Sequence, residues 1–152
     1  MNAFLLVSLA MDRRPSHQPL QRYPGLTLLV AAYNEQDTIV GTIESIARQQ
    51  YPGPLEVIVA NDGSKDRTAE LVREQLPNYP WLRLLDLKQN VGKANALNEA
   101  LKLVSHTLTA TVDADSWLFH DALTSIVERY FQDPKNTRAV AGAVMVRNSR
   151  AS

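Results

Sequence analysis

The sequence predicts an α/β domain with a Rossmann-like three-layer α/β/α sandwich and a mostly parallel sheet. Short apolar runs of strand type alternate with longer segments whose apolar residues recur at helical spacing. The connections between them are short, and this order predicts right-handed crossovers with helices on both faces of the sheet. Four polar segments, two of which carry a glycine, follow the apolar runs where a strand passes into a helix.

Length and composition exclude several classes of protein. The chain has 152 residues, and a compact domain of that size buries about two-thirds of its unfolded surface. The absence of cysteine excludes disulfides and thiolate metal sites. Sixteen basic and sixteen acidic residues cancel, so we expect no nucleic-acid partner. The three histidines are scattered at spacings that suit no zinc site, so any metal should be held by oxygen.

The start of the chain is mostly apolar over ten residues, and Arg13 and Arg14 follow shortly. Ten residues are too few to span a bilayer, which takes about 20, and a signal peptide carries its basic residues before its apolar core. Two interpretations remain open: the remnant of a membrane helix with the arginines on the cytoplasmic side, or a disordered or loosely docked terminus. We assign residues 1–25 to this segment and its proline-bearing linker, and residues 26–152 to the domain.

The first half of the domain holds two strand–helix units. Residues 26–32 form a nearly continuous apolar run, typical of a strand covered on both faces, and Asp37 is expected to cap the next helix. A second strand is expected over 55–60 and a helix from about 66 to 76, ended by prolines. The apolar face of the first helix is expected to hold Ile39, Ile43, Ile46 and Ala47.

The second half continues the alternation. A strand is expected over 82–87, and a buried strand should end at Asp113. Asp121 should cap a final helix, and residues 139–146 suggest a fifth strand. The two helices of this half have apolar faces made, respectively, of Leu97, Ala100, Leu101 and Val104, and of Leu123, Ile126, Val127 and Tyr130.

Two acids, Asp113 and Asp115, stand one residue apart at the end of the fourth strand. At roughly 4 Å two like charges repel by about 4 kcal/mol at an effective dielectric near 20. A hard ion such as Mg²⁺ or Mn²⁺ removes that cost and usually brings a phosphate with it. The alternative is a pair of ordinary turn and helix-capping acids.

The other strand ends carry polar segments at 33–35, 62–64 and 90–93, and in open parallel sheets ligands bind at these ends. Asp62 could accept a hydrogen bond from the imide N–H of a uracil while Gly63 lets the backbone turn beside it; a plain Asp-Gly turn is the alternative. Tyr33 could stack on a base and Glu35 could fix its edge, or both could be surface residues.

Lys93 starts the third helix, where free N–H groups and the helix dipole favour an anion. Because the dipole disfavours a lysine there, Lys93 suggests a phosphate contact, with a solvated surface lysine as the alternative. Asn90 and Asn95 are weaker candidates, and Trp117 is expected in the core or pocket wall. The chain lacks both Gly-x-Gly-x-x-Gly after the first strand and a Gly-x-x-x-x-Gly-Lys-Ser/Thr loop, which counts against a dinucleotide dehydrogenase and a P-loop enzyme.

Four motifs, in this order and spacing, resemble those of family-2 glycosyltransferases with a GT-A-type fold. The resemblance covers about residues 26–150, and the Gly-Lys-Ala-x-Ala-Leu-Asn form is more similar to membrane-bound processive synthases of poly-N-acetylglucosamine, hyaluronan and cellulose. The motifs are Val30-Ala31-Ala32-Tyr33-Asn34-Glu35, Val59-Ala60-Asn61-Asp62-Gly63-Ser64-Lys65-Asp66, Asn90-Val91-Gly92-Lys93-Ala94-Asn95-Ala96-Leu97-Asn98 and Val112-Asp113-Ala114-Asp115.

The resemblance implies a role for each matching residue. Asp62 would hold the uracil of a UDP-sugar, and Lys93 would lie beside the phosphates. Asp115, with Asp113, would ligate the Mg²⁺ or Mn²⁺ that bridges the diphosphate, which acts as a Lewis acid in transfer with inversion. The implied nucleotide-sugar-binding residues are Ala32, Tyr33, Glu35, Asp62, Lys93, Asp113 and Ala114.

The chain departs from the family in one respect. Family members continue to a segment with a catalytic aspartate, and here no Asp or Glu follows Ala143, so the general base is expected beyond Ser152 and the domain is expected to be truncated on its C-terminal side. The implied function is transfer from a UDP-sugar to a glycan acceptor, at the cytoplasmic face of the cell membrane in the full-length protein. One alternative is a non-catalytic nucleotide-binding module that needs a partner. Another is a sugar nucleotidyltransferase, which would carry a glycine-rich basic loop where residues 33–37 are polar and acidic.

Overall fold

The computed structural model describes residues 19–133, 138 and 140. The chain divides into two compact units, and Gln21–Thr124 form the one that holds the sheet. The last helix, α5 (Ala122–Gln132), lies mostly in the other unit. The apolar start of the chain and, apart from Val140, the predicted strand over 139–146 lie outside the described residues. No helix in the described part of the chain has the length and apolarity to cross a bilayer.

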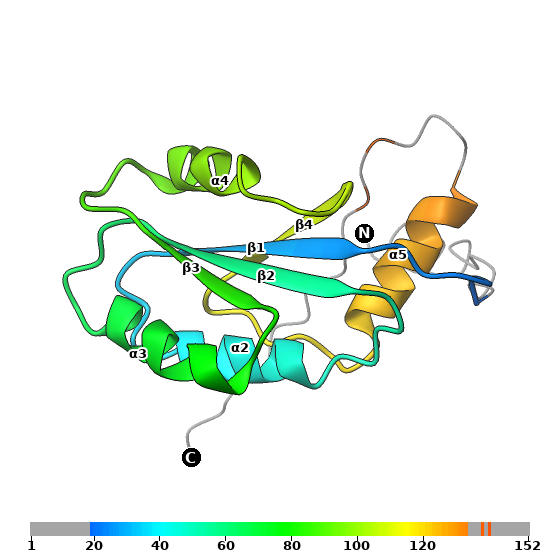
Figure 1. Ribbon diagram of the computed structural model, residues 1–152, viewed down its shortest axis with the longest axis horizontal. Coiled ribbons are helices and arrows are strands. Elements are labelled where there is room, and N and C mark those ends of the chain that lie inside the picture. Colours follow the sequence, from blue (N-terminus) through cyan, green and yellow to red (C-terminus); the bar gives the residue numbers. More distant parts are fainter. Residues whose placement is uncertain (1–18, 134–137, 139, 141–152) are drawn as a thin grey trace, which may run out of the picture. The chain divides into compact units, whose positions relative to one another are not determined.

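Within the part of the chain that the structure describes, the sheet has four strands in the order β3-β2-β1-β4, and all of their pairings are parallel (Figure 1). Val30 in β1 stands opposite Val59 in β2 and Val112 in β4, so the strands are in register and their carboxyl ends meet at one edge. The parallel sheet predicted from the sequence is confirmed. The strands are β1 (Leu26–Ala32), β2 (Leu55–Asn61), β3 (Leu82–Asp86) and β4 (Leu108–Asp113).

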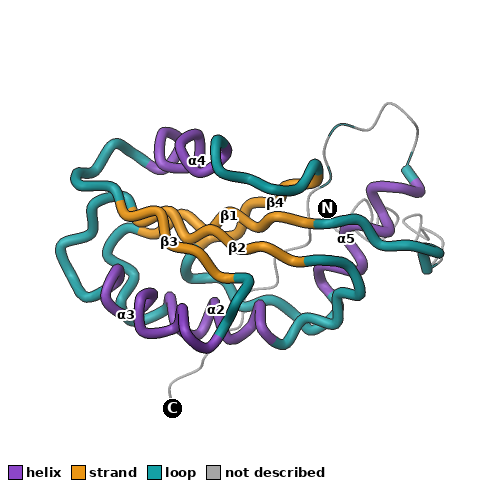
Figure 2. The backbone as a smooth tube through the Cα atoms, in the orientation of Figure 1, coloured by secondary structure: helices purple, strands orange, loops and turns teal. Residues whose placement is uncertain are grey.

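Helices cover both faces of this sheet. In Figure 1, α2 (Ile39–Ala47) and α3 (Thr68–Gln75) lie on one face, and α4 (Lys93–Leu101) lies on the other. Figure 2 shows the same three layers by element type. A short 3-10 helix, η1 (Leu76–Asn78), follows α3 and contains Pro77, one of the prolines expected to end that helix. The predicted α/β/α sandwich is therefore confirmed.

The core lies on the two central strands. All but Ala31 in β1 and Leu55 in β2 are buried, because these strands have a neighbour on each side and a helix layer on each face. Ala96 and Ala100 of α4 pack against Leu29 and Ile58. Their small side chains let α4 lie close to the sheet, which brings its first turn near the strand ends.

The fourth strand differs from the prediction. We expected β4 to be buried, but Thr109 and Thr111 are exposed and alternate with half-buried residues. Its only strand partner among the described residues is β1, so β4 is the edge strand of the described sheet. The alternation of exposed and half-buried residues shows that one face of β4 is open to solvent. An uncharged, β-prone composition does not distinguish such a strand from a central one.

Four details of the helices also differ from the prediction. Thr38, not Asp37, is the N-cap residue of α2, because the Glu35 carbonyl accepts hydrogen bonds from the backbone N–H groups of both Thr38 and Ile39. Ala47 is exposed, whereas the three isoleucines of α2 are buried. In α4 the buried stripe is Ala96 and Ala100, so Leu101 faces solvent. Val104 lies beyond the helix and reaches the core from the following loop.

Candidate functional site

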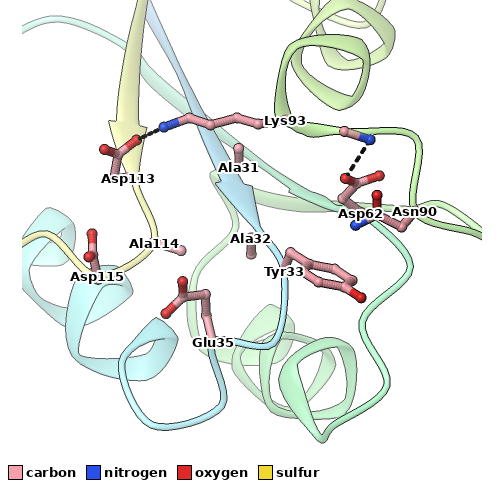
Figure 3. A pocket seen from close by; sticks show the side chains of 11 residues that line it. Ala31, Ala32, Tyr33, Glu35, Asp62, Asn90, Lys93, Asp113, Ala114 and Asp115 are labelled. Atoms are coloured by element: carbon pink, nitrogen blue, oxygen red, sulfur yellow. Dashed lines mark hydrogen bonds and ion pairs between the residues drawn. The ribbon is translucent and has the colours of Figure 1, made fainter.

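A cavity of about 310 Å³ opens at the carboxyl ends of β1, β2 and β4 (Figure 3). All four polar segments predicted from the sequence contribute to its wall, and so does every residue implied by the resemblance. The geometric expectation that these segments meet at one edge is therefore met. The lining residues are Ala31, Ala32, Tyr33, Glu35, Asp62, Asn90, Gly92, Lys93, Asp113, Ala114 and Asp115.

The loop after β1 supplies one wall of the cavity. Tyr33 is 44% exposed and offers a ring face at the rim. Glu35 is half-buried, and its carboxylate accepts a hydrogen bond of 2.8 Å from the Thr38 hydroxyl. Between them Asn34 adopts a left-handed backbone conformation with φ of 56°, which asparagine tolerates better than most residues.

This loop is hydrogen-bonded to the loop after β2, a contact that the sequence analysis missed. The Asn34 N–H donates to the Ser64 hydroxyl at 2.9 Å, and the Asn34 side-chain oxygen accepts from the Lys65 N–H at 2.8 Å. The Glu35 N–H donates to the Thr68 hydroxyl at 2.8 Å. The two loops therefore form a single bonded unit, and Asn34, Ser64 and Thr68 support the cavity without lining it.

Asp66 belongs to the same unit. Its carboxylate accepts from the Gln36 N–H at 3.1 Å and from both the N–H and the hydroxyl of Thr68. Desolvation raises the pKa of Asp66, but these hydrogen bonds outweigh it and hold the pKa below its ordinary value. The Asp-Gly-Ser-Lys-Asp stretch thus contains a scaffold acid as well as the predicted site acid.

Asp62 is only 2% exposed and sits at the back of the cavity. Its two carboxylate oxygens accept backbone hydrogen bonds from Val91 at 2.7 Å and Gly92 at 2.9 Å. The next residue, Gly63, has a φ of 66°, and a Cβ there would lie 2.4 Å from the carbonyl carbon of Gln89. The close turn expected at Gly63 is therefore present, and it faces the loop that precedes α4.

The acidic turn after β4 forms the opposite wall. Asp113 is paired with Lys93, whose Nζ lies 2.5 Å from its Oδ1. Figure 3 shows Asp113 extending toward Lys93, whereas Asp115 lies beyond Ala114 on the side of Glu35. The Asp115 side chain makes no hydrogen bond or ion pair with any residue that the structure describes.

Three polar side chains, Thr42 and Ser45 of α2 and Gln49 just beyond its end, hold the acidic turn in place. The buried Thr42 hydroxyl donates to the Ala114 carbonyl at 2.7 Å. Ser45 accepts from the Leu118 N–H at 3.2 Å, and the Gln49 amide donates to the Phe119 carbonyl at 2.6 Å. A polar residue at positions 42, 45 and 49 follows helical spacing, which was the one sequence signal that could have indicated this support.

Trp117 was expected in the core or the pocket wall, and this prediction is wrong. Its side chain is 55% exposed, and the Arg48 guanidinium lies 5.2 Å from the centre of its ring. The segment after Asp115 is bonded to Ser45 and Gln49, and this path carries Trp117 away from the cavity.

The two weaker candidates from the sequence, Asn90 and Asn95, have different positions. Asn90 lines the cavity, whereas the Asn95 amide donates to the Val91 carbonyl on the helix surface.

The cavity is acidic, since Glu35, Asp62, Asp113 and Asp115 face a single cation, Lys93, among its lining residues. A bound phosphate would therefore gain from a further positive charge. Within the described residues no cluster of three or more His, Cys, Asp or Glu side chains could hold a metal on its own. Hard oxygen donors without a complete cage suit a Mg²⁺-type ion that is shared with phosphates and water.

Comparisons with known proteins agree on one family. The model of the family described as glycosyl transferase family 2 matches residues 27–150. A poly-beta-1,6-N-acetyl-D-glucosamine synthase of Staphylococcus epidermidis is 39% identical over 128 residues, covering 84% of this chain and 30% of that protein. A synthase of the same name from Staphylococcus aureus is 40% identical over 124 residues, covering 82% of this chain and 29% of that protein. The chain thus spans less than a third of the length of these relatives.

Solved structures with similar folds are also glycosyltransferases. The mannosyltransferase PcManGT from Pyrobaculum calidifontis, in complex with GDP-Man and Mn²⁺, aligns with a TM-score of 0.74 at 29% identity over 86% of this chain and 39% of that one. TarS from S. aureus, in complex with UDP, aligns with a TM-score of 0.63 at 25% identity over 70% of this chain and 33% of that one. Together with the family match, these likenesses show that the chain belongs to glycosyl transferase family 2 and has a fold of the GT-A type.

Proposed function

We propose that the cavity binds a UDP-sugar together with a divalent cation, for inverting transfer of the sugar to a polysaccharide acceptor. The observation that carries this proposal is the meeting of Asp62, Lys93, Asp113 and Asp115 in one cavity at the strand ends. The relatives support the substrate class, because two are named as synthases of a polymer of N-acetylglucosamine. The mannosyltransferase and TarS support a nucleotide ligand, since they hold GDP-Man with Mn²⁺ and UDP.

We assign the uracil base of the donor to the cavity walls that are formed by the loops after β1 and β2. Tyr33 offers an exposed ring for stacking on uracil, and Glu35 lies beside it at the rim. Asp62, at the back of the cavity, would accept the hydrogen bond from the imide N–H of the uracil. The small side chains of Ala32 and Ala114 leave room for the ligand to approach the backbone on both sides.

The diphosphate is assigned to the region between Lys93 and the acidic turn. Lys93 begins α4, so its ammonium and the free N–H groups of the first turn both favour an anion. Asp115, with Asp113, would hold Mg²⁺ or Mn²⁺, and a bound cation supplies Lewis-acid stabilisation of the charge on the leaving diphosphate. Lys93 would then exchange its partner Asp113 for a phosphate oxygen.

A second candidate function is a donor-binding module that works beside a partner supplying the acceptor half. It is favoured by the lining of the cavity, because all of the charged side chains in it are assigned to the donor and its cation. In either case we propose action at the cytoplasmic face of the membrane. The support is the apolar start followed by Arg13 and Arg14.

The test is calorimetric titration with UDP in Mn²⁺ and in EDTA, followed by radiolabelled sugar transfer from UDP-N-acetylglucosamine. We expect UDP to bind in Mn²⁺ and to bind much more weakly in EDTA. Transfer by the isolated chain would support the enzyme, and binding without transfer would support the module. If UDP does not bind in Mn²⁺, the proposed donor site is wrong.

A further inference from the structure

The connection between β3 and α4 is held to the rest of the fold by one side chain. Residues 88–90 are exposed. Beyond Leu87 and apart from bonds to α4 itself, the only hydrogen bonds from this connection to another described segment are the two accepted by Asp62, from the N–H groups of Val91 and Gly92. A buried carboxylate with two backbone donors is a strong, charge-assisted contact.

The surrounding glycines show that the connection is shaped for this contact. At Gly63 a Cβ would collide with the backbone of Gln89 and Asn90, so the two chains approach more closely than a side chain allows. Gly92 has φ of 90° and ψ of 146°, a conformation that residues with a side chain rarely adopt, yet a Cβ there would meet nothing within 4 Å. Glycine at position 92 is therefore required by backbone conformation and not by space.

The connection ends where Lys93 begins. Lys93 is the first residue of α4, one position after Gly92, and its ammonium reaches across the cavity to Asp113. The path of Val91 and Gly92 therefore sets where the Lys93 side chain and the free N–H groups of the helix enter the cavity. Asp62 is bonded to that path at Val91 and Gly92, and Figure 3 shows the dashed hydrogen bond from Asp62 to the chain just before Lys93.

We infer that Asp62 is a positioning residue for the phosphate side of the cavity, acting through the Val91–Gly92 backbone on Lys93. Each Asp62 oxygen already accepts one hydrogen bond, so a uracil imide would share an oxygen that the loop occupies. The ligand in this inference rests on the proposed function, whereas the role of Asp62 in ordering the connection does not. The inference predicts that Asp62 matters even to a ligand without a base.

The decisive probes are UDP and inorganic pyrophosphate, each titrated with Mn²⁺ into the wild type and Asp62→Asn. An asparagine keeps one acceptor and places an N–H group against the other donor. We expect the affinities for UDP and pyrophosphate to fall by similar factors of about tenfold, a size typical of a lost positioning contact. A fall for UDP with unchanged pyrophosphate affinity would overturn the inference, because it would leave Asp62 with a base contact alone.

Amide hydrogen exchange in the free protein tests the loop without any ligand. In Asp62→Asn we expect faster exchange at Val91 and Gly92, by at least about tenfold, since local opening sets the rate. Unchanged exchange would overturn the inference even if UDP binding were lost. If wild type binds neither UDP nor pyrophosphate in Mn²⁺, the proposed function fails while the exchange result still decides the role of Asp62.

Three further variants guard against general loss of folding. Gly92→Ala leaves Asp62 intact and strains the connection from its other end, so we expect the same two effects. The double variant should lose no more pyrophosphate affinity, and show no faster loop exchange, than the more impaired of the two single variants, because both changes break one contact. Glu56→Gln is the matched control, since it removes a buried carboxylate from the other end of β2 and should leave pyrophosphate affinity and loop exchange unchanged. Additive effects in the double variant would contradict the inference.

Discussion

The acids at the two ends of the sheet differ in the hydrogen-bond donors that the chain supplies to them. At the amino end, Glu56 of β2 is 8% exposed, and its carboxylate accepts hydrogen bonds from the Thr27 hydroxyl, the Arg83 guanidinium, and both the N–H and hydroxyl of Ser105. At the carboxyl end, Asp115 is exposed and has no partner among the described residues. An acid that its own chain supplies with donors is part of the fold, whereas an acid left without them is available to a ligand.

Asp62 and Asp113 fall between these extremes. Asp62 is buried and bonded like Glu56, but it lines the cavity. Asp113 is exposed like Asp115, but it is paired with Lys93. Neither burial nor the presence of donors alone therefore separates scaffold acids from site acids, because Asp62 and Asp113 combine donors supplied by the chain with a place in the cavity wall. The predictions below test this distinction.

The largest effect is expected for Asp115→Asn. Because Asp115 is the acid left open for a cation, its loss should reduce the Mn²⁺-dependent affinity for UDP by about 100-fold, or roughly 2.7 kcal/mol. The melting temperature should stay nearly unchanged, since no described contact is lost. Calorimetry with Mn²⁺ and with EDTA, together with thermal melts, measures both. Equal affinity in the variant and the wild type would refute the metal assignment.

Glu56→Gln should show the opposite pattern. The glutamine keeps the shape but exchanges one acceptor oxygen for an N–H group that faces donors, so the free energy of unfolding should fall by about 1–2 kcal/mol at neutral pH. The affinity for UDP should not change, because Glu56 lies at the other end of β2. Denaturant unfolding measures the change in the free energy of unfolding, and calorimetry measures the affinity for UDP. A loss of UDP affinity would show that the ends of the sheet are coupled.

The pH dependence of stability sharpens the same contrast. Burial raises the pKa of Glu56, but hydrogen bonds from Ser105, Thr27 and Arg83 outweigh it and lower the pKa from 4.5 to about 2. The contribution of Glu56 is therefore complete above pH 4.5 and is lost as the pH falls toward about 2.

The stability gap between wild type and Glu56→Gln should accordingly narrow as the pH falls from 5 toward 3. Urea unfolding at several pH values measures this gap. Asp115→Asn serves as the comparison, because that acid has no described donor to lose. A gap that stays constant over this range would show that the hydrogen bonds to Glu56 do not favour its charged form.

The smallest effect is expected for Thr42→Val. Valine matches the shape of threonine but lacks the hydroxyl that donates to the Ala114 carbonyl, and a lost hydrogen bond of this kind costs about 1 kcal/mol. We expect a fall of about threefold to fivefold in Mn²⁺-dependent UDP affinity through a looser acidic turn. Thr124→Val, which removes an exposed hydroxyl bonded to the Gln50 carbonyl, is the control. Equal effects of both variants on UDP affinity would argue against a positioning role for Thr42.

Much of the fold could be predicted from the sequence because its signals are local. The apolar run of β1 gave its bounds, and the polar segments at strand ends identified the residues that line the cavity. The roles of these residues at the ligand stay predictions. The sequence motifs do not by themselves show which polar residues line the cavity, as Asp62 and Asp115 do, and which support it, as Asn34 and Asp66 do.

The missed features all depend on which segments become neighbours in space. The bonds from Asn34 to Ser64, and from Thr42 to Ala114, join residues that lie 30 and 72 positions apart. Trp117 was misplaced because the path of its segment is set by α2 and not by its own composition. β4 was misjudged because nothing in an uncharged strand indicates whether a further strand lies beside it.

The hydrogen bonds between the loop after β1 and the loop after β2 also bear on how donor preference could be altered. Asn34, Glu35 and Gln36 each hold a partner among residues 64–68, so neither loop can change its backbone path alone. A chimera that took only the Tyr33–Glu35 stretch from a relative with another sugar nucleotide and another residue at position 34 would leave the Lys65 N–H without the Asn34 side-chain oxygen that accepts its hydrogen bond. Exchange of donor preference between family members should therefore succeed when both loops are transplanted as one cassette.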